Sequence, residues 1–234
     1  MHGFTAQAAY TWSHNFDEVT AYRGALPQDS TNFRGDYGPS DFDSRNTFVG
    51  LATYNIPGSQ KLSLLSKGWQ LNTLMTFHSG NPFSVFSSAD TSGTDEGVQR
   101  ANFVPGVSPY TGFKKQTINA NWLNPAAFVD APAGTFGDTR RNGYIGPGYG
   151  DVDFSIFKNT PITERISTQF RVEMFNLFNR TNFASPASNE SLFNPNYTLD
   201  NALALSTTIG SANGAPGIGA GEPFNTQLAL KIIF

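Results

Sequence analysis

The fold is decided by the stretch FNTQLALKIIF, which occupies residues 224–234 at the end of the sequence. Apolar side chains alternate there with polar or small ones, and only Ile233 breaks the alternation. A period of two residues indicates a β-strand with one apolar face. Its length is close to the ~9–11 residues with which a tilted strand crosses a bilayer. The last strand of a soluble β-sandwich alternates in the same way, so this stretch alone leaves both structures open.

The same alternation recurs in five other parts of the sequence. In one of them, Phe170 and Met174 lie on the apolar face of the predicted strand, and Arg171 lies on the other face. We expect six strands in all, over residues 4–14, 44–56, 69–87, 150–158, 165–179 and 223–234. The third of these strands would continue past a kink at residues 80–82.

The connections between these strands alternate in length. Residues 57–68 and 159–164 form two short turns, whereas 15–43, 88–150 and 180–222 form three long loops. Long loops without secondary structure are unusual in a compact soluble domain. Outer-membrane barrels, in contrast, have short periplasmic turns and longer extracellular loops. The loop lengths therefore favour an antiparallel up-and-down meander that spans the outer membrane.

The composition excludes several classes of protein. A net charge of −3 and a pI of about 5.5 leave no broad basic surface, so we expect no nucleic-acid partner. No apolar run approaches the ~20 residues of a membrane-spanning helix. Charged residues make up 14% of the chain, against roughly 25% in ordinary soluble domains. With no cysteine, the chain has neither disulfides nor thiolate metal ligands.

Motifs for catalysis are also missing from the sequence. The three histidines are scattered, and there is no G-x-S-x-G or H-E-x-x-H motif. Asp151 and Asp153 share one face of a predicted strand, as a pair of glycosidase carboxylates would, but the polarity of a barrel lumen explains them more simply. We therefore expect no enzyme activity, no catalytic residue, no metal site and no cofactor.

Several short segments of the sequence resemble a known family. The segment VEMFNLFNRTNF (172–183), followed by a final strand that ends in Phe234, resembles the last two strands of TonB-dependent outer-membrane receptors. Other segments resemble the subgroup of these receptors that has an N-terminal carboxypeptidase-regulatory-like domain: YGPSDFDSR (37–45), GWQL (68–71), SGNPF (79–83), WLNPAAF (122–128), and GTFG (134–137) through RN (141–142) to GPG (146–148).

This resemblance implies an all-β fold, the C-terminal segment of a transmembrane barrel of about 22 strands. Residues 1–234 would be a partial barrel, without the plug and the N-terminal strands, and by itself not competent for transport. The whole receptor would import a bulky nutrient, such as an oligosaccharide or a metal chelate, across the outer membrane of a Gram-negative bacterium. Its partners would be outer-membrane lipid, the barrel-assembly machinery and, only through the missing plug region, the TonB complex.

The resemblance and the alternation together suggest three groups of functional residues. The barrel-assembly signal would comprise Leu228, Leu230, Ile232 and Phe234. The side chains that face the lumen would be Gln169, Arg171, Glu173, Asn225, Gln227 and Lys231. A ligand-contact loop would present Tyr110, Trp122, Arg140, Arg141 and Tyr144, although these residues could equally pack loop against loop.

Two alternatives from other classes stay open at this point. One is a passive porin-like or adhesin barrel that is assembled from several short chains. The other is a soluble secreted β-sandwich that binds carbohydrate, in which the apolar faces would form the core.

Overall fold

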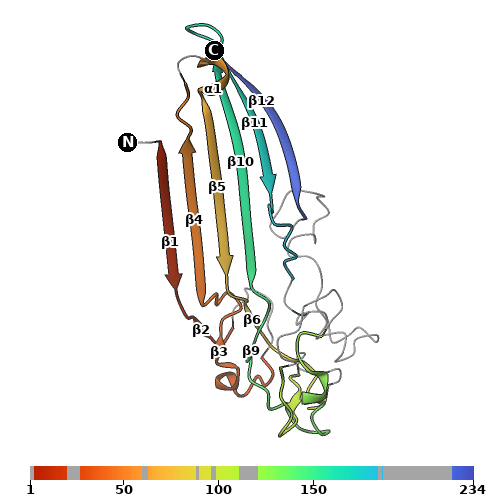
Figure 1. The fold of residues 1–234 in the computed structure, drawn as a ribbon. Helices are drawn as coiled ribbons and strands as arrows, with labels where there is room; N and C mark the ends of the chain where they lie inside the picture. The colour runs from red at the N-terminus through yellow and green to blue at the C-terminus, as the bar shows by residue number, and fades with distance from the viewer. Residues whose placement is uncertain are drawn as a thin grey trace.

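The computed structural model describes residues 3–19, 27–59, 63–87, 90–95, 99–110, 121–183, 186 and 223–234. Six long strands form one antiparallel sheet in the order β1-β4-β5-β10-β11-β12, without crossovers (Figure 1). They are β1 (Phe4–Trp12), β4 (Asn46–Asn55), β5 (Trp69–His78), β10 (Tyr149–Pro161), β11 (Ser167–Phe175) and β12 (Asn225–Ile233). The predicted six-strand meander is thus confirmed.

The two ends of the sheet differ in what they carry. Both termini and the two short connections lie at one end, which we call the turn end (Figure 1). One of these connections contains the helix α1 (Ser63–Ser66), and the other follows β10. The long connections leave from the opposite end, which we call the loop end. This arrangement follows from the parity of the meander, as the loop lengths predicted.

The prediction that the third strand continues to residue 87 is wrong. β5 ends at His78, and Phe83 belongs to β6 (Pro82–Phe83), which pairs with β9 (Tyr144–Ile145) in a separate small sheet. The chain bends at Gly80, where a Cβ atom would lie 1.8 Å from the carbonyl oxygen of Gly146. Pro82 also lacks the N–H group that a central strand needs.

Other boundaries shift by a few residues. β11 ends at Phe175 instead of residue 179, because Asn176 and Asn179 adopt positive φ angles of 46° and 47°. That left-handed conformation is incompatible with a strand and is most accessible to glycine and asparagine. β10 runs to Pro161, beyond the predicted residue 158, because its pairing with β11 continues to Ser167.

The hydrophobic core lies outside the six-stranded sheet, beyond its loop end. The described parts of residues 13–45 and 79–148 fold together there, and we call them the loop assembly (Figure 1). Its small elements are β2 (Phe16–Asp17), η1 (Phe33–Asp36), β3 (Gly38–Pro39), β6, β7 (Asn102–Phe103), η2 (Pro125–Ala127), β8 (Phe128–Val129) and β9. The core consists of Phe83, Val85, Ala101, Leu123, Ala127 and Phe128.

Helices play a small part in this fold. Among the described residues, no helix has both the length and the apolar character needed to cross a membrane.

Candidate functional site

The register of the sheet gathers the apolar side chains on one face. Residues that pair directly across neighbouring strands point to the same face of a sheet. One such row crosses all six strands and is apolar throughout: Phe4, Tyr54, Leu71, Ile156, Val172 and Leu228. We call this side the apolar face. Phe4 is 65% exposed and Leu228 is 66% exposed, so the described part of the chain leaves this face uncovered at both edges of the sheet.

Aromatic residues gather at both ends of the apolar face. Phe4, Tyr54 and Trp69 lie at the turn end, and Tyr10, Trp12 and Phe77 lie at the loop end. The hydroxyl group of Tyr10 donates a hydrogen bond of 2.7 Å to the side-chain oxygen of Asn46. Rings with an apolar body and a polar tip suit the boundary between hydrocarbon and water.

The opposite side, which we call the polar face, has a matching row one residue along each strand. This row contains Thr5, Thr53, Asn72, Ser155, Glu173 and Gln227. Thr53 Oγ1 donates to Asn72 Oδ1 (3.1 Å), and Asn72 Nδ2 donates to Ser155 Oγ (3.3 Å). A hollow of about 360 Å³ lies over this row, and Leu51, Leu74, Asp153 and Phe175 also line it. The two faces therefore suit two different surroundings.

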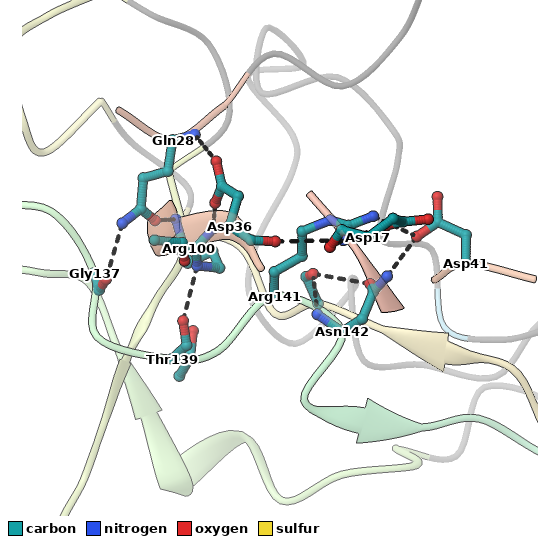
Figure 2. A network of polar contacts seen from close by, with 11 residues as sticks. Asp17, Gln28, Asp36, Asp41, Arg100, Gly137, Thr139, Arg141 and Asn142 are labelled. Carbon is teal, nitrogen blue, oxygen red and sulfur yellow. Dashed lines mark hydrogen bonds and ion pairs between the residues drawn. The ribbon is translucent and has the colours of Figure 1, made fainter. Parts of the chain in front are cut away.

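The loop assembly is held together by a buried polar network centred on Arg100 (Figure 2). The Arg100 guanidinium forms an ion pair with Asp36, and its Nε donates to the carbonyl oxygen of Thr139 (2.8 Å). The other carboxylate oxygen of Asp36 accepts from the backbone N–H of Gln28 (3.0 Å), and the Gln28 amide donates to the carbonyl oxygen of Gly137 (3.0 Å). The network therefore joins the first long connection to the second.

A second half of the network surrounds Arg141 and Asn142 (Figure 2). Arg141 Nη1 lies 2.7 Å from the carboxylate of Asp17, and Arg141 Nη2 lies 3.7 Å from that of Asp41. The Asn142 amide donates to Asp41 (2.5 Å) and to the carbonyl oxygen of Pro39 (2.7 Å). Every one of these partners comes from the first long connection, so the network bonds the two loops to each other in one body.

The residues predicted to contact a ligand have different environments in this body. Trp122 Nε1 donates to the carbonyl oxygen of Ile145 (2.7 Å), and Tyr144 packs edge-on against Phe128. Arg141 is buried in the network, Arg140 is exposed, and Tyr110 is 55% exposed. Burial, assisted by Tyr110 and Asp138, raises the pKa of Tyr144 to about 12. Ligand contact stays a prediction, and the geometry favours Tyr110 and Arg140 for it.

The other predicted groups fall on the sheet. Gln169, Arg171, Glu173, Asn225, Gln227 and Lys231 all lie on the polar face, because Gln169 pairs with Lys231 and Glu173 pairs with Gln227. Leu228, Leu230 and Ile232 lie together on the apolar face of β12, and Phe234 follows this strand. Their roles as lumen lining and as assembly signal stay predictions.

Sequence reasoning missed two groups of residues. Asp36 and Arg100 are 64 positions apart and belong to no periodic pattern, so nothing in the sequence pairs them. The asparagines of the segment 176–182 do give a signal, namely three Asn residues at intervals of three, but the predicted boundary divides them between the strand 165–179 and the loop 180–222.

The described residues contain no group of three or more His, Cys, Asp or Glu side chains that is arranged to hold a metal ion. Asp90 accepts hydrogen bonds from the backbone N–H of Asp95 (2.9 Å) and from the hydroxyl of Ser92 (2.9 Å), and both lower the pKa of its carboxyl group. These bonds lie within one exposed turn, so they stabilise the turn itself.

Comparison with known proteins identifies the family. The family model described as the outer membrane beta barrel domain matches residues 1–218, which is most of the chain. No curated protein and no solved structure gives a match. The match agrees with a two-faced sheet whose apolar face is uncovered. It argues against the alternative of a soluble sandwich. The chain belongs to the outer membrane beta barrel domain family, and its place is the outer membrane of a Gram-negative bacterium.

Proposed function

We propose that this chain is the C-terminal part of a TonB-dependent receptor that imports a bulky nutrient, such as an oligosaccharide or a metal chelate. The observation that carries the proposal is the pair of open edges of the sheet. Among the residues that the structure describes, β1 and β12 are the edge strands, and each is hydrogen-bonded to a single neighbouring strand. A sheet in lipid cannot leave its edges unpaired, because each unsatisfied backbone group costs several kcal/mol. The six strands therefore need further strands.

The free groups of β1 can be named from its pairing with β4. The backbone N–H of Asn55 donates to the carbonyl oxygen of Gly3, and that of Ser13 donates to the carbonyl oxygen of Arg45. Because hydrogen-bonded pairs recur at every second residue of an antiparallel ladder, the backbone groups of the odd residues of β1 bond to β4. The N–H and C=O groups of the even residues then point outward, and these residues are Phe4, Ala6, Ala8, Tyr10 and Trp12. A preceding antiparallel strand of the complete barrel would satisfy these groups.

The two faces and the loop assembly fit such a receptor. The apolar face would contact outer-membrane lipid, and the polar face with its hollow would line the lumen around a plug. The loop assembly would form part of the outer surface that captures the nutrient. The role is binding and passage instead of catalysis, and the TonB complex would act only through the plug region of the complete receptor.

The mass of the native protein tests this proposal. Native cells are fractionated, and the outer membrane is probed with an antibody against this chain in boiled denaturing gels. We expect a band several-fold heavier than 25.4 kDa. Nutrient uptake by the same cells should stop when the proton gradient is dissipated, because energised import depends on it. A band of 25.4 kDa in that membrane would reject the proposal.

A passive barrel made of several copies is the second candidate, and one observation favours it. β1 runs from the turn end to the loop end, whereas β12 runs in the opposite direction (Figure 1). The β12 strand of one copy could therefore pair antiparallel with β1 of the next. This candidate predicts the 25.4 kDa band, oligomers in unboiled samples, and uptake that continues without the proton gradient.

A further inference from the structure

The last two strands pair in a register that their connection does not explain. β11 ends at Phe175 and β12 begins at Asn225, and these two residues are partners in the sheet. In a tight hairpin, the type and length of the turn fix the register. A connection as long as residues 176–224 imposes no register by its own geometry, since closing a long loop depends only weakly on its length. Another feature must align these strands.

The segment Asn176–Asn182, which directly follows β11, is bound to the strand on its inner side. The backbone N–H of Asn176 donates to the carboxylate of Asp153 (3.0 Å), and that of Leu177 donates to the carbonyl oxygen of Val152 (2.8 Å). Both acceptors belong to β10. The segment therefore starts from a fixed position beside β10.

Asn176 and Arg180 close the segment into a compact turn. The Asn176 side-chain amide donates to the carbonyl oxygen of Arg180 (2.9 Å), and its oxygen accepts from the N–H of Arg180 (2.8 Å). Asn176 is 5% exposed and has a positive φ angle, so both its side chain and its backbone suit asparagine. These two hydrogen bonds fix the direction of the residues that follow Arg180.

Asn182 repeats this type of bonding on the first residues of β10. Its side-chain amide donates to the carbonyl oxygen of Gly150 (3.0 Å), and its oxygen accepts from the N–H of Gly150 (3.0 Å). Asn182 is 1% exposed. Its side chain makes the two hydrogen bonds to Gly150 that the backbone of a residue in a neighbouring strand would make. The segment is thus attached to β10 at both of its ends.

Asn179, between these two anchors, holds the start of β12. Its side-chain oxygen accepts a hydrogen bond of 3.0 Å from the backbone N–H of Phe224, one residue before β12 begins. Asn179 has a positive φ angle as well. The Asn179 side chain therefore connects the hydrogen-bonded turn after β11 with Phe224, the residue that leads into β12.

We propose that the segment Asn176–Asn182 is a register clamp, in which Asn179 aligns β12 on β11 for assembly of the barrel. The turn provides a fixed acceptor for Phe224, and the alternation of β12 then completes the pairing. A slip of one residue would turn every side chain of β12 to the wrong face, so a slip of two residues is the competing register. The clamp selects between registers that present the same faces, whatever the barrel imports.

Disulfide crosslinking in the native membrane protein tests the clamp, because the chain contributes no cysteine of its own. Glu173 and Gln227 are direct partners in the observed register, so a disulfide between Glu173→Cys and Gln227→Cys reports that register. The pairs Glu173→Cys with Asn225→Cys, and Glu173→Cys with Ala229→Cys, report slips of two residues in either direction. Diagonal neighbours lie ~7–8 Å apart, and although their Cβ atoms are somewhat closer, they exceed the ~3.5–4.5 Å of a disulfide, so each pair reports one register.

Four variants separate the side-chain bond from the backbone conformation. Asn179→Ala and Asn179→Gly both remove the acceptor, and glycine keeps the positive φ angle without strain. We expect both to lower the ratio of native to slipped disulfide at least several-fold. Asn179→Asp keeps an acceptor and should retain the native ratio. Asn142→Ala is the matched control: Asn142 also has a positive φ angle but lies outside the clamp, and its variant loses two bonds within the loop assembly, so it should reduce the amount of assembled protein and leave the ratio unchanged.

The glycine variant decides the outcome, because glycine adopts the positive φ angle without strain and this variant should fold even where the alanine variant does not. A native ratio in Asn179→Gly would overturn the clamp. So would a shift of equal size in Asn142→Ala, since general loosening of the loop end would then explain both results.

Discussion

Arg100 and Asp36 form an ion pair inside the loop assembly, with side chains that are 8% and 5% exposed. They join two connections that are separated along the chain by the strands β4 and β5. Breaking a buried pair by removing one partner leaves an uncompensated charge, which typically costs about 3–5 kcal/mol. The Asp36 carboxylate also accepts from Gln28, so it links three segments of the loop assembly.

Replacement of Asp36 by asparagine should therefore loosen the loop assembly. We expect faster hydrogen exchange and faster proteolysis in residues 27–43 and 99–110, while the strands of the sheet stay protected. Arg34→Gln is the matched control, because Arg34 is exposed on the same helix η1. Equal protection of the loop assembly in wild type and Asp36→Asn would show that the ion pair is not needed for its stability.

An arginine on the apolar face should block membrane assembly. Phe154 lies on the apolar face of the central strand β10, and its partners are Thr73 and Met174. Arginine on the lipid face costs about 2–4 kcal/mol near the bilayer midplane. We expect Phe154→Arg to be depleted from the outer-membrane fraction. Ser155→Arg places the same charge one residue away, opposite Glu173 on the polar face, and should assemble normally. Normal assembly of both variants would contradict the assignment of the faces.

How far the sequence predicts this molecule depends on the range of the interactions. Alternation is a local signal, and it gave all six strands and both faces, because a strand such as residues 225–233 carries its pattern within itself. The kink at residues 80–82 was predicted, but the end of the strand at His78 was missed, because Phe83 pairs instead with Tyr144, which lies far along the chain. Arg100 and Asp36 were missed for the same reason, and Tyr110 and Trp122 looked alike until their surroundings were known.

The pKa of Tyr144 predicts a loss of stability at high pH. Its value rises from 10.0 to about 12 on folding, mainly because of burial. The folded protein then holds this proton more tightly than the unfolded chain, so the contribution is complete below about pH 10 and falls as the pH rises toward about 12. Tyrosinate absorbance and proteolysis of the loop assembly should reveal this step in wild type, and Tyr144→Phe should lack it. The same step in both proteins would assign it to another group.

Two glycines with similar φ angles allow a steric contact to be isolated. Gly68 (φ +78°) and Gly106 (φ +80°) both have the left-handed conformation, in which alanine costs about 1–2 kcal/mol. A Cβ atom at Gly68 would also lie 2.1 Å from the carbonyl oxygen of Asn159, whereas nothing lies within 4 Å at Gly106. Gly68→Ala should therefore lower the thermal stability clearly more than Gly106→Ala. Similar losses would show that the end of strand β10 around Asn159 moves away easily.

The exposed ring of Tyr110 provides a test of the ligand-contact prediction. Tyr110→Ala should leave assembly and protease resistance unchanged and should weaken nutrient uptake, because the ring contributes little to the core of the loop assembly. Trp122→Ala, in contrast, should lower protease resistance, since it removes the bond to Ile145 and a ring packed on the core. Uptake that is unaffected in Tyr110→Ala would exclude this residue from the ligand site.

The separation of the core from the sheet sets different demands on two parts of one sequence. Lipid is a liquid that adapts to any shape, so residues such as Val172 and Leu228 need only be apolar. The interior around Leu123 is close-packed like a crystal, where one methylene group too many or too few is felt. We therefore expect Val, Leu, Ile and Phe to replace one another freely along the apolar face, whereas Leu123, Ala127 and Phe128 tolerate few substitutes.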